Sequence, residues 1–324
     1  MASDAPPIAA SGSTPPAPTS SGPTSSSTAT PKSTTILWCH PRSASTMFEC
    51  MLLTRQDEFR VLHEPAGETW YYSKERVSKR FSDEECEKSG HGELTFAKAW
   101  KDIAEPHPKL RTFSKDMAQY LIDLSLPLGT AASSFGDVPN TPTNPTLIPT
   151  PLLLQPHLTH TFLIRHPRKA VPSYARLCYP GSETGFEYFD KEEMGYKELR
   201  RLFDFVKQET GRTPLLIEAE ELLKNPEETV EMWCKEVGIE FDESMLDWED
   251  AAHGHFDKWP GFHNDAIASK GVGKQEQPSA GSSTTPHASG AKELSPELKE
   301  AVEFCMEDYE YLRQFSRKAP GASA

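Results

Sequence analysis

The sequence of 324 residues lacks three features that would assign it to a class at once. No apolar run approaches the roughly 18 residues that cross a bilayer, so no membrane association is expected. The opening residues MASDAPPIAASG offer neither the basic stretch nor the apolar stretch of a signal peptide, and we expect a cytoplasmic protein. An excess of positive charge is missing too, because the net charge is −14, which argues against nucleic acid as a partner.

Paired cysteines are also absent. None of the cysteines forms a Cys-x-x-Cys pair, and their spacing is irregular, so we interpret them as reduced thiols of the core rather than as a disulfide framework. His253-Gly254-His255 has the spacing of a pair of metal ligands but lacks supporting partners at suitable distances. We therefore expect no metal site.

Large apolar side chains are almost missing from residues 1–33, which consist mainly of Ser, Thr, Pro and Ala. Such a segment cannot bury enough surface to offset its ordering entropy, and a disordered tail is predicted there and at 319–324. The polar composition of 127–158 and 275–292 predicts two low-complexity surface insertions. Residues 34–318 then form one domain, long enough for a substantial core.

Five short apolar runs predict strands: Thr34–Cys39, Phe59–Leu62, Leu110–Lys115, Thr159–Arg165 and Thr213–Ile217. Helical segments alternate with them, among them Met47–Leu53, Lys191–Glu209, Glu227–Val237 and a last helix from Ser295-Pro296 to about Arg317. This alternation predicts an α/β protein, a three-layer sandwich with a mainly parallel central sheet and helices on both faces.

The turn between the first strand and its helix reads His40-Pro41-Arg42-Ser43-Ala44-Ser45-Thr46. A strand, a tight turn and a helix start form an anion site, because unpaired N–H groups and the helix dipole face the ligand. Arg42 adds a cation, and the hydroxyl groups of the turn add donors. An ordinary capped helix start is the alternative. The glycines and the lysine of an ATP-binding P-loop are missing, which disfavours a triphosphate with Mg²⁺.

This turn resembles the 5′-phosphosulfate loop P-[KR]-S-G-[ST]-T of sulfotransferases that use 3′-phosphoadenylyl sulfate (PAPS). The second signature of that family is an arginine ending a later strand with a serine eight residues on, and Arg165 and Ser173 match it. The resemblance covers about residues 34–270 without the 127–158 insertion. The blocks LHEPAGETWYY, HTFLIRHPRKAVPSYARLC and FDKWPGFHNDAIAS are similar to a fungal and bacterial sulfotransferase-like branch with a P-loop-like fold.

The resemblance implies a set of cofactor-binding residues. The 5′-phosphosulfate would be held by Arg42, Ser43, Ala44, Ser45 and Thr46, and the 3′-phosphate by Arg165 and Ser173, with Lys270 in a loop that closes over it. The dense basic cluster around Arg165 at a helix start, where cations are disfavoured, independently suggests an anion there. Two departures stand out. Ala44 replaces the usual glycine, so a strongly left-handed φ would be strained there, and Met47 replaces a tryptophan that stacks on adenine.

The candidates for the general base follow two other predicted strands. Glu64, with His63 beside it, is the first choice, and Asp116 is the second; for Glu64 a structural ion pair is an equal alternative. Arg42 would stabilise charge on the bridging oxygen.

The resemblance thus implies an enzyme that transfers a sulfuryl group from PAPS, without a metal, to a small-molecule acceptor, and it suggests specialised metabolism. A P-loop nucleotide kinase or NTPase and a non-catalytic nucleotide- or partner-binding relative remain the alternatives. The oligomeric state stays open.

Overall fold

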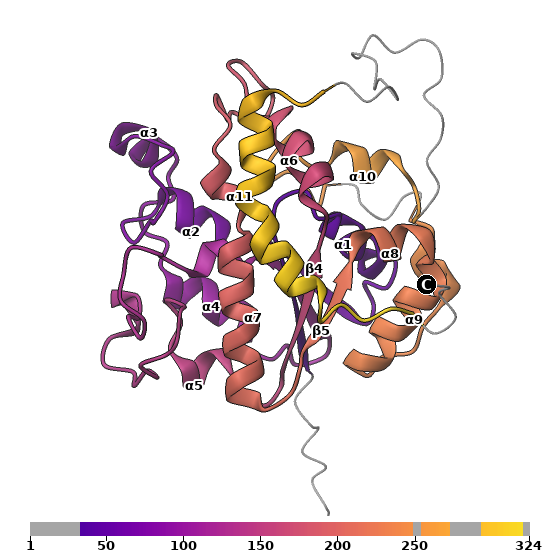
Figure 1. Ribbon diagram of the computed structural model, residues 1–324. Coiled ribbons are helices and arrows are strands. Elements are labelled where there is room, and N and C mark those ends of the chain that lie inside the picture. The colour runs from indigo at the N-terminus through magenta and orange to yellow at the C-terminus, as the bar shows by residue number, and fades with distance from the viewer. Residues whose placement is uncertain (1–32, 249–253, 273–292, 320–324) are drawn as a thin grey trace, which may run out of the picture. The chain divides into compact units, whose positions relative to one another are not determined.

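The structure is a computed structural model and describes residues 33–248, 254–272 and 293–319. Among these residues one parallel sheet with the strand order β2-β3-β1-β4-β5 lies at the centre (Figure 1). Each strand falls on a predicted apolar run, and the first has the predicted bounds: β1 Thr34–Cys39, β2 Phe59–His63, β3 Arg111–Met117, β4 Leu158–Ile164 and β5 Leu215–Glu218.

Helices cover both faces of this sheet. Because successive side chains of a strand point to opposite faces, the contacts of two neighbouring residues of β4 show which helix covers which face of the sheet. Phe162 packs edge-on against Phe203 of α7, and Thr161 accepts a hydrogen bond from the indole of Trp233 in α9 at 3.4 Å. Helix α11 lies beside α7 and passes in front of β4 in Figure 1. The predicted fold class, an α/β sandwich with a mainly parallel sheet, is confirmed.

The α-helices within the described ranges have the bounds α1 Ser45–Leu53, α2 Gly67–Tyr72, α3 Asp83–Lys88, α4 Phe96–Ala104, α5 Thr150–Leu153, α6 Pro167–Ala175, α7 Tyr196–Thr210, α8 Ala219–Lys224, α9 Pro226–Val237, α10 Asn264–Ala268 and α11 Pro296–Arg313. The short 3-10 helices are η1 Ala118–Leu121, η2 Ser133–Phe135, η3 Lys191–Met194 and η4 Glu243–Leu246. The single helix expected over Lys191–Glu209 is therefore two elements, η3 and α7. Gly195 separates them with a φ of 70°, and a Cβ atom there would collide with the side chain of Gln119.

Part of the segment 127–158, which its composition predicted to be a surface insertion, packs into the core, although Leu128 is exposed. Ile148 and Leu153 are fully buried in the common core. The buried side chain of Asn144 organises the segment, because its amide nitrogen donates to Ile148 O at 2.8 Å and its oxygen accepts from Thr146 N at 2.8 Å. Side-chain hydrogen bonds of this kind let a sequence rich in Pro and Thr pack without regular structure.

The described ranges bear on the expectations for the cysteines and for membrane-spanning helices, and they leave several others untested. The cysteines are all buried and unpaired, as predicted: Cys39, Cys50, Cys86, Cys178, Cys234 and Cys305. None of the helices described is long and apolar enough to span a membrane. The predicted tail 1–33, the insertion 275–292, His253 and most of 319–324 lie outside the described residues.

Candidate anion site and base cluster

The carboxyl ends of β1 and β4 meet near the middle of one sheet edge. The two strands are paired neighbours, with Trp38 opposite Phe162. After β1 the chain leads to β2 on one side of the sheet, and after β4 it leads to β5 on the other side. In parallel α/β sheets such a switch point is where ligands bind. Both predicted anion-binding turns lie at this edge.

The turn after β1 contains two residues in left-handed backbone conformations. Arg42 has a φ of 60° and Ala44 a φ of 69°. For residues with a Cβ atom this conformation costs roughly 1–2 kcal/mol, so the strain foreseen for Ala44 is present. Helix α1 begins directly afterwards at Ser45, and its first N–H groups have no partners within the helix. The strained turn therefore places free donors and Arg42 at the same edge.

The buried ring of His40 joins this turn to the end of β4. Its Nδ1 donates to Pro41 O at 2.9 Å, and its Nε2 accepts from Arg165 N at 3.0 Å. Burial lowers the pKa of His40 to about 3, although the Pro41 carbonyl opposes the shift, so the ring stays neutral. His40 thus holds the backbone of the two predicted anion-binding turns in register.

Side chains make the same connection. Arg42 Nε donates to Ser173 Oγ on α6 at 2.9 Å, and Arg165 Nη1 donates to Arg42 O at 3.2 Å. Residues 120 positions apart or more are thereby brought together, as a common nucleotide site requires. The hydroxyl of Ser43 is buried and has no hydrogen-bond partner among the described residues, which fits a turn built to receive an oxyanion.

Carboxylates of the protein already contact these cations. Asp265 Oδ2 forms ion pairs with Arg42, at 2.7 Å, and with Arg176. Glu220 lies 3.3 Å from Lys169 and 3.9 Å from Arg165. Each predicted cationic pocket therefore faces an internal carboxylate.

A second cluster lies after β2, where Glu64 and His63 were the predicted base candidates. The fully buried ammonium of Lys115 pairs with Glu64 Oε1 and lies 3.4 Å from Glu49 Oε2. Tyr120 donates to Glu64 Oε2 at 3.1 Å. Burial alone would raise the pKa of Glu64, but the surrounding groups, chiefly the Lys115 charge and its hydrogen bond, together lower that pKa to about 2. Glu64 is an ion-paired acceptor and a weak base.

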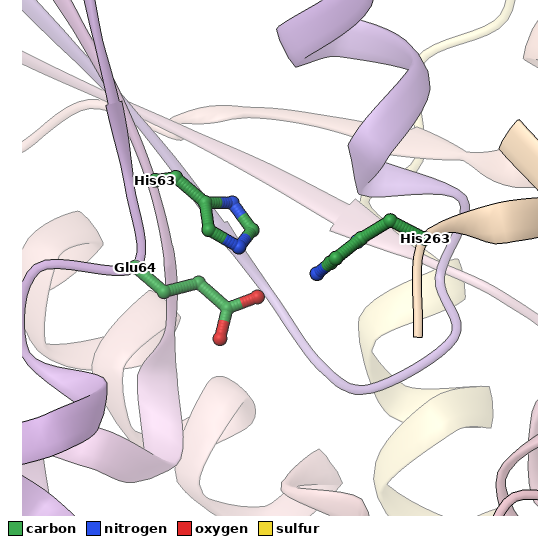
Figure 2. A group of neighbouring side chains, drawn as sticks. All are labelled: His63, Glu64 and His263. Atoms are coloured by element: carbon green, nitrogen blue, oxygen red, sulfur yellow. The ribbon is translucent and has the colours of Figure 1, made fainter. Parts of the chain in front are cut away.

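His63 has a different environment. Its Nδ1 donates to Glu49 Oε1 at 2.8 Å, and its Nε2 is buried without a hydrogen-bond partner in the described ranges. Figure 2 shows the ring of His63 directed toward the space between Glu64 and His263. A carboxylate that orients an imidazole through Nδ1 and leaves Nε2 free is the arrangement of a general base. Sequence reasoning missed Glu49, which lies in α1 without any motif.

His263 links this base cluster to the anion turn. Its Nδ1 lies 3.0 Å from Thr46 Oγ1, and its ring meets that of His63 edge-on at 4.6 Å between centroids. Burial and then the Lys115 charge lower the pKa of His263 to about 3, so the ring is neutral. In the sequence, His263 stands out only as part of the block FDKWPGFHNDAIAS and has no predicted role. In the structure it lies between Thr46 of the anion turn and His63, and Figure 2 shows it beside His63 and Glu64.

Asp116 and Lys270 are the other residues predicted for the site. Asp116 is fully buried and accepts hydrogen bonds from Ala66 N and Met117 N, each at 3.0 Å, so it supports the loop after Glu64. Burial, and then the Glu64 charge, raises the pKa of Asp116 to about 7. Lys270 is exposed, and its carbonyl accepts from Trp248 N at 3.1 Å.

A metal could be held by one atom each of His63, Glu64 and His263, which lie within 4.8 Å of one another. The ammonium of Lys115 on Glu64 opposes a second cation at this place. The absence of a metal stays a prediction.

The chain is similar to a known protein family over most of the α/β domain. A model of the sulfotransferase family matches residues 36–243, which is well over half of the chain. The chain belongs to this sulfotransferase family. The matched region contains both predicted anion-binding turns and the base candidates His63 and Glu64, whereas His263 and Asp265 lie beyond it. Membership supports a transferase and confirms the resemblance of the sequence motifs.

Curated relatives of this chain come from Arabidopsis thaliana. The branched-chain-amino-acid aminotransferase-like protein 2 is 29% identical over 214 residues, which are 65% of this chain and 31% of that protein. Protein 1 of the same name is 33% identical over 90 residues, which are 28% and 14% of the two chains. The chain thus spans less than a third of the length of these relatives.

Two solved structures resemble the chain loosely. The sulfotransferase domain of the Synechococcus PCC 7002 olefin synthase has a TM-score of 0.42 at 16% identity, covering 85% of this chain and 94% of its own. Retinol dehydratase in complex with androsterone and the inactive cofactor PAP has a TM-score of 0.36 at 12% identity, covering 90% and 83%. At these scores the likeness adds nothing to the family assignment.

Proposed function

We propose that this sulfotransferase transfers a sulfuryl group from PAPS to a hydroxyl or amine group of a small-molecule acceptor. The contact between Arg42 Nε and Ser173 Oγ carries this proposal, because it joins the two predicted phosphate-binding turns in one site. The N–H groups at the start of α1, with Ser43, Ser45 and Thr46, would hold the 5′-phosphosulfate. Arg165 and Ser173 would hold the 3′-phosphate, and Lys270 would close over it from its loop.

His63 is the better candidate for the general base. Glu64 is held by Lys115 and Tyr120, whereas His63 Nε2 has no hydrogen-bond partner among the described residues and Glu49 accepts a hydrogen bond from Nδ1. The proton of the acceptor would pass to His63 Nε2 as the acceptor atom bonds to sulfur and the bond from sulfur to the bridging phosphate oxygen breaks. Glu49 would stabilise the imidazolium that results. Asp116, fixed by two backbone N–H groups, would support the loop rather than take the proton.

The arginine of the anion turn would serve the departing group. Sulfuryl transfer is an in-line displacement, so positioning and charge stabilisation supply most of its catalysis. Arg42 retains a planar fork of donors, and its pKa is lowered only to about 10, chiefly by burial, so it remains a cation at neutral pH. It would neutralise the charge that develops on the bridging oxygen.

An open cleft of about 580 Å³ beside the loop after β2 is the candidate route for the acceptor. Aromatic rings of Tyr72, Phe81 and Trp259 line it, together with Lys258, which also donates to Glu64 O at 2.9 Å. Aromatic walls suit a small aromatic or otherwise planar acceptor. Specialised metabolism, a cytoplasmic location and the absence of a metal are further parts of this proposal.

Nucleotide binding gives the first test. Adenosine 3′,5′-bisphosphate, the product nucleotide, is expected to raise the melting temperature more than ATP or AMP at equal concentration, because it alone can reach both cationic turns. A larger effect of ATP with Mg²⁺ would favour the kinase or NTPase alternative. Binding without any sulfated product from a broad panel of acceptors would favour a non-catalytic relative.

Two matched variants test the assignment of the base. His63→Gln is expected to lower kcat by about 10²–10⁴-fold while the affinity for the bisphosphate stays within twofold, since the ring acts on the acceptor proton. Glu64→Gln is expected to lower kcat less than His63→Gln does. The reverse order of the two effects would return the role of base to Glu64.

A further inference from the structure

Residues 254–272, hereafter the covering segment, lie over the anion turn. Phe262 O accepts a hydrogen bond from Arg42 Nη1, and Asp265 Oδ2 accepts one from Arg42 Nη2 at 2.7 Å. With Nε bound to Ser173, every nitrogen of the Arg42 side chain has a protein partner. The guanidinium that should meet the ligand is therefore already occupied, in part by a carboxylate.

Asp265 contacts a second arginine through the same atom. Arg176 Nη2 donates to Asp265 Oδ2, so one carboxylate oxygen bridges two guanidinium groups. Arg176 directly follows the last residue of α6, about one helical turn after Ser173, which is itself bound to Arg42. Two guanidinium groups that converge on one oxygen are the donor set that proteins use for phosphate and sulfonate oxygens.

The surroundings of Arg42 call for an anion at this place. Arg42 is only 13% exposed, and Arg176 and Arg165 both lie close enough to lower its pKa further after burial has done so. The carboxylate of Asp265 is 56% exposed, so it can leave the arginines for water. Asp265 belongs to the short helix α10 of the covering segment and not to the sheet edge that builds the turn.

We propose that Asp265 is an internal competitor for the anionic ligand of this site and that Arg176 is an additional ligand-binding residue. A phosphate or sulfonate oxygen takes the place of Asp265 Oδ2 between Arg42 and Arg176 when the nucleotide binds, and the carboxylate moves into solvent. The proposal rests on the proposed function for the identity of the ligand, but its core concerns any oxyanion of this size and charge.

Titration calorimetry on the full chain tests the competition with adenosine 3′,5′-bisphosphate as the probe. Asp265→Asn is expected to bind it about 5–20-fold more tightly than the unchanged protein, because the ligand no longer displaces a charge. Arg176→Gln is expected to bind it at least fivefold more weakly. Asp257→Asn is the matched control: Asp257 is an exposed carboxylate of the same segment without an ion pair in the described ranges, and its loss should change affinity less than twofold.

The outcomes separate the two proposals. Equal or weaker binding by Asp265→Asn, with Asp265→Ser agreeing and both variants folded by circular dichroism, overturns the competitor role. If no form binds the bisphosphate, thermal stabilisation by pyrophosphate decides: a larger shift for Asp265→Asn than for the unchanged protein retains the competitor and refutes only the proposed nucleotide. If no form binds the bisphosphate and pyrophosphate shifts the melting temperature of both forms equally, both proposals are refuted.

Discussion

The turn after β1 and the loop after β2 lie at the same sheet edge, yet they balance their charges in opposite ways. Arg42 and Arg176 pair with Asp265, a carboxylate that is 56% exposed and belongs to another segment. Lys115 pairs with Glu49 and Glu64, and all three side chains are buried. An exposed partner can be exchanged for a ligand, whereas a buried partner fixes geometry. The first arrangement suits binding and the second suits a positioned base.

The largest expected effect comes from breaking the buried arrangement. Lys115→Met leaves Glu49 and Glu64 buried without their ammonium partner, and we expect it to lower the free energy of unfolding by about 3–5 kcal/mol. Urea denaturation at pH 7 measures this. Lys101→Met removes one partner of an exposed pair with Glu105 and should cost less than about 1 kcal/mol. Similar losses in the two variants would show that the Lys115 cluster is not a fixed charge network.

The pH dependence of stability sharpens the comparison with a smaller effect. Burial raises the pKa of Glu64, but Lys115 and the other groups around it together lower it to about 2, below the ordinary value of 4.5. The unfolded state therefore binds the proton first, and the stability that Glu64 contributes is complete above pH 4.5 and declines as the pH falls toward 2. Between pH 6 and pH 3 the unchanged protein should lose about 2 kcal/mol more than Glu64→Gln does.

Urea midpoints of the two proteins at four pH values between 3 and 6 measure this difference. The variant starts from a lower stability at pH 6, because Lys115 has lost one of its carboxylates, and the two curves should approach each other in acid. Parallel curves would mean that the Glu64 carboxylate is not stabilised by the fold. Asp265→Asn, at a carboxylate that is more than half exposed, should leave the slope of the free energy of unfolding against pH almost unchanged.

The sequence predicts the first of the two regions much better than the second. Arg42, Ser173 and Arg165 stand in two short motifs, and parallel strands bring the residues after their carboxyl ends to one edge, so their proximity follows from the strand pattern alone. The sheet follows equally well, because each strand is a short apolar run. The polar composition of 127–158 gave a wrong expectation around Asn144, because side-chain hydrogen bonds let this polar segment pack into the core.

The base cluster has no comparable sequence signature. Glu49 lies within the apolar helix α1, Lys115 alternates with core residues in β3, and His263 comes from a segment 200 residues after His63. Each would pass as an ordinary residue of its element. Their ion pairs appear only when three elements pack, so the sequence indicated Glu64 by its place after a strand and left its partners unknown.

The smallest expected effect concerns the strain of the anion turn. Ala44 has a φ of 69°, which glycine adopts without a Cβ penalty, so Ala44→Gly should raise the free energy of unfolding by about 0.5–1 kcal/mol despite the greater freedom of the unfolded chain. Ala97→Gly within α4 should have the opposite sign and cost about 0.5–1 kcal/mol. Thermal unfolding of both variants beside the unchanged protein resolves the signs. If Ala44→Gly also lowered the free energy of unfolding, the turn would relax out of the left-handed region in solution. The strained turn would then not fix the direction of the N–H groups at the start of α1.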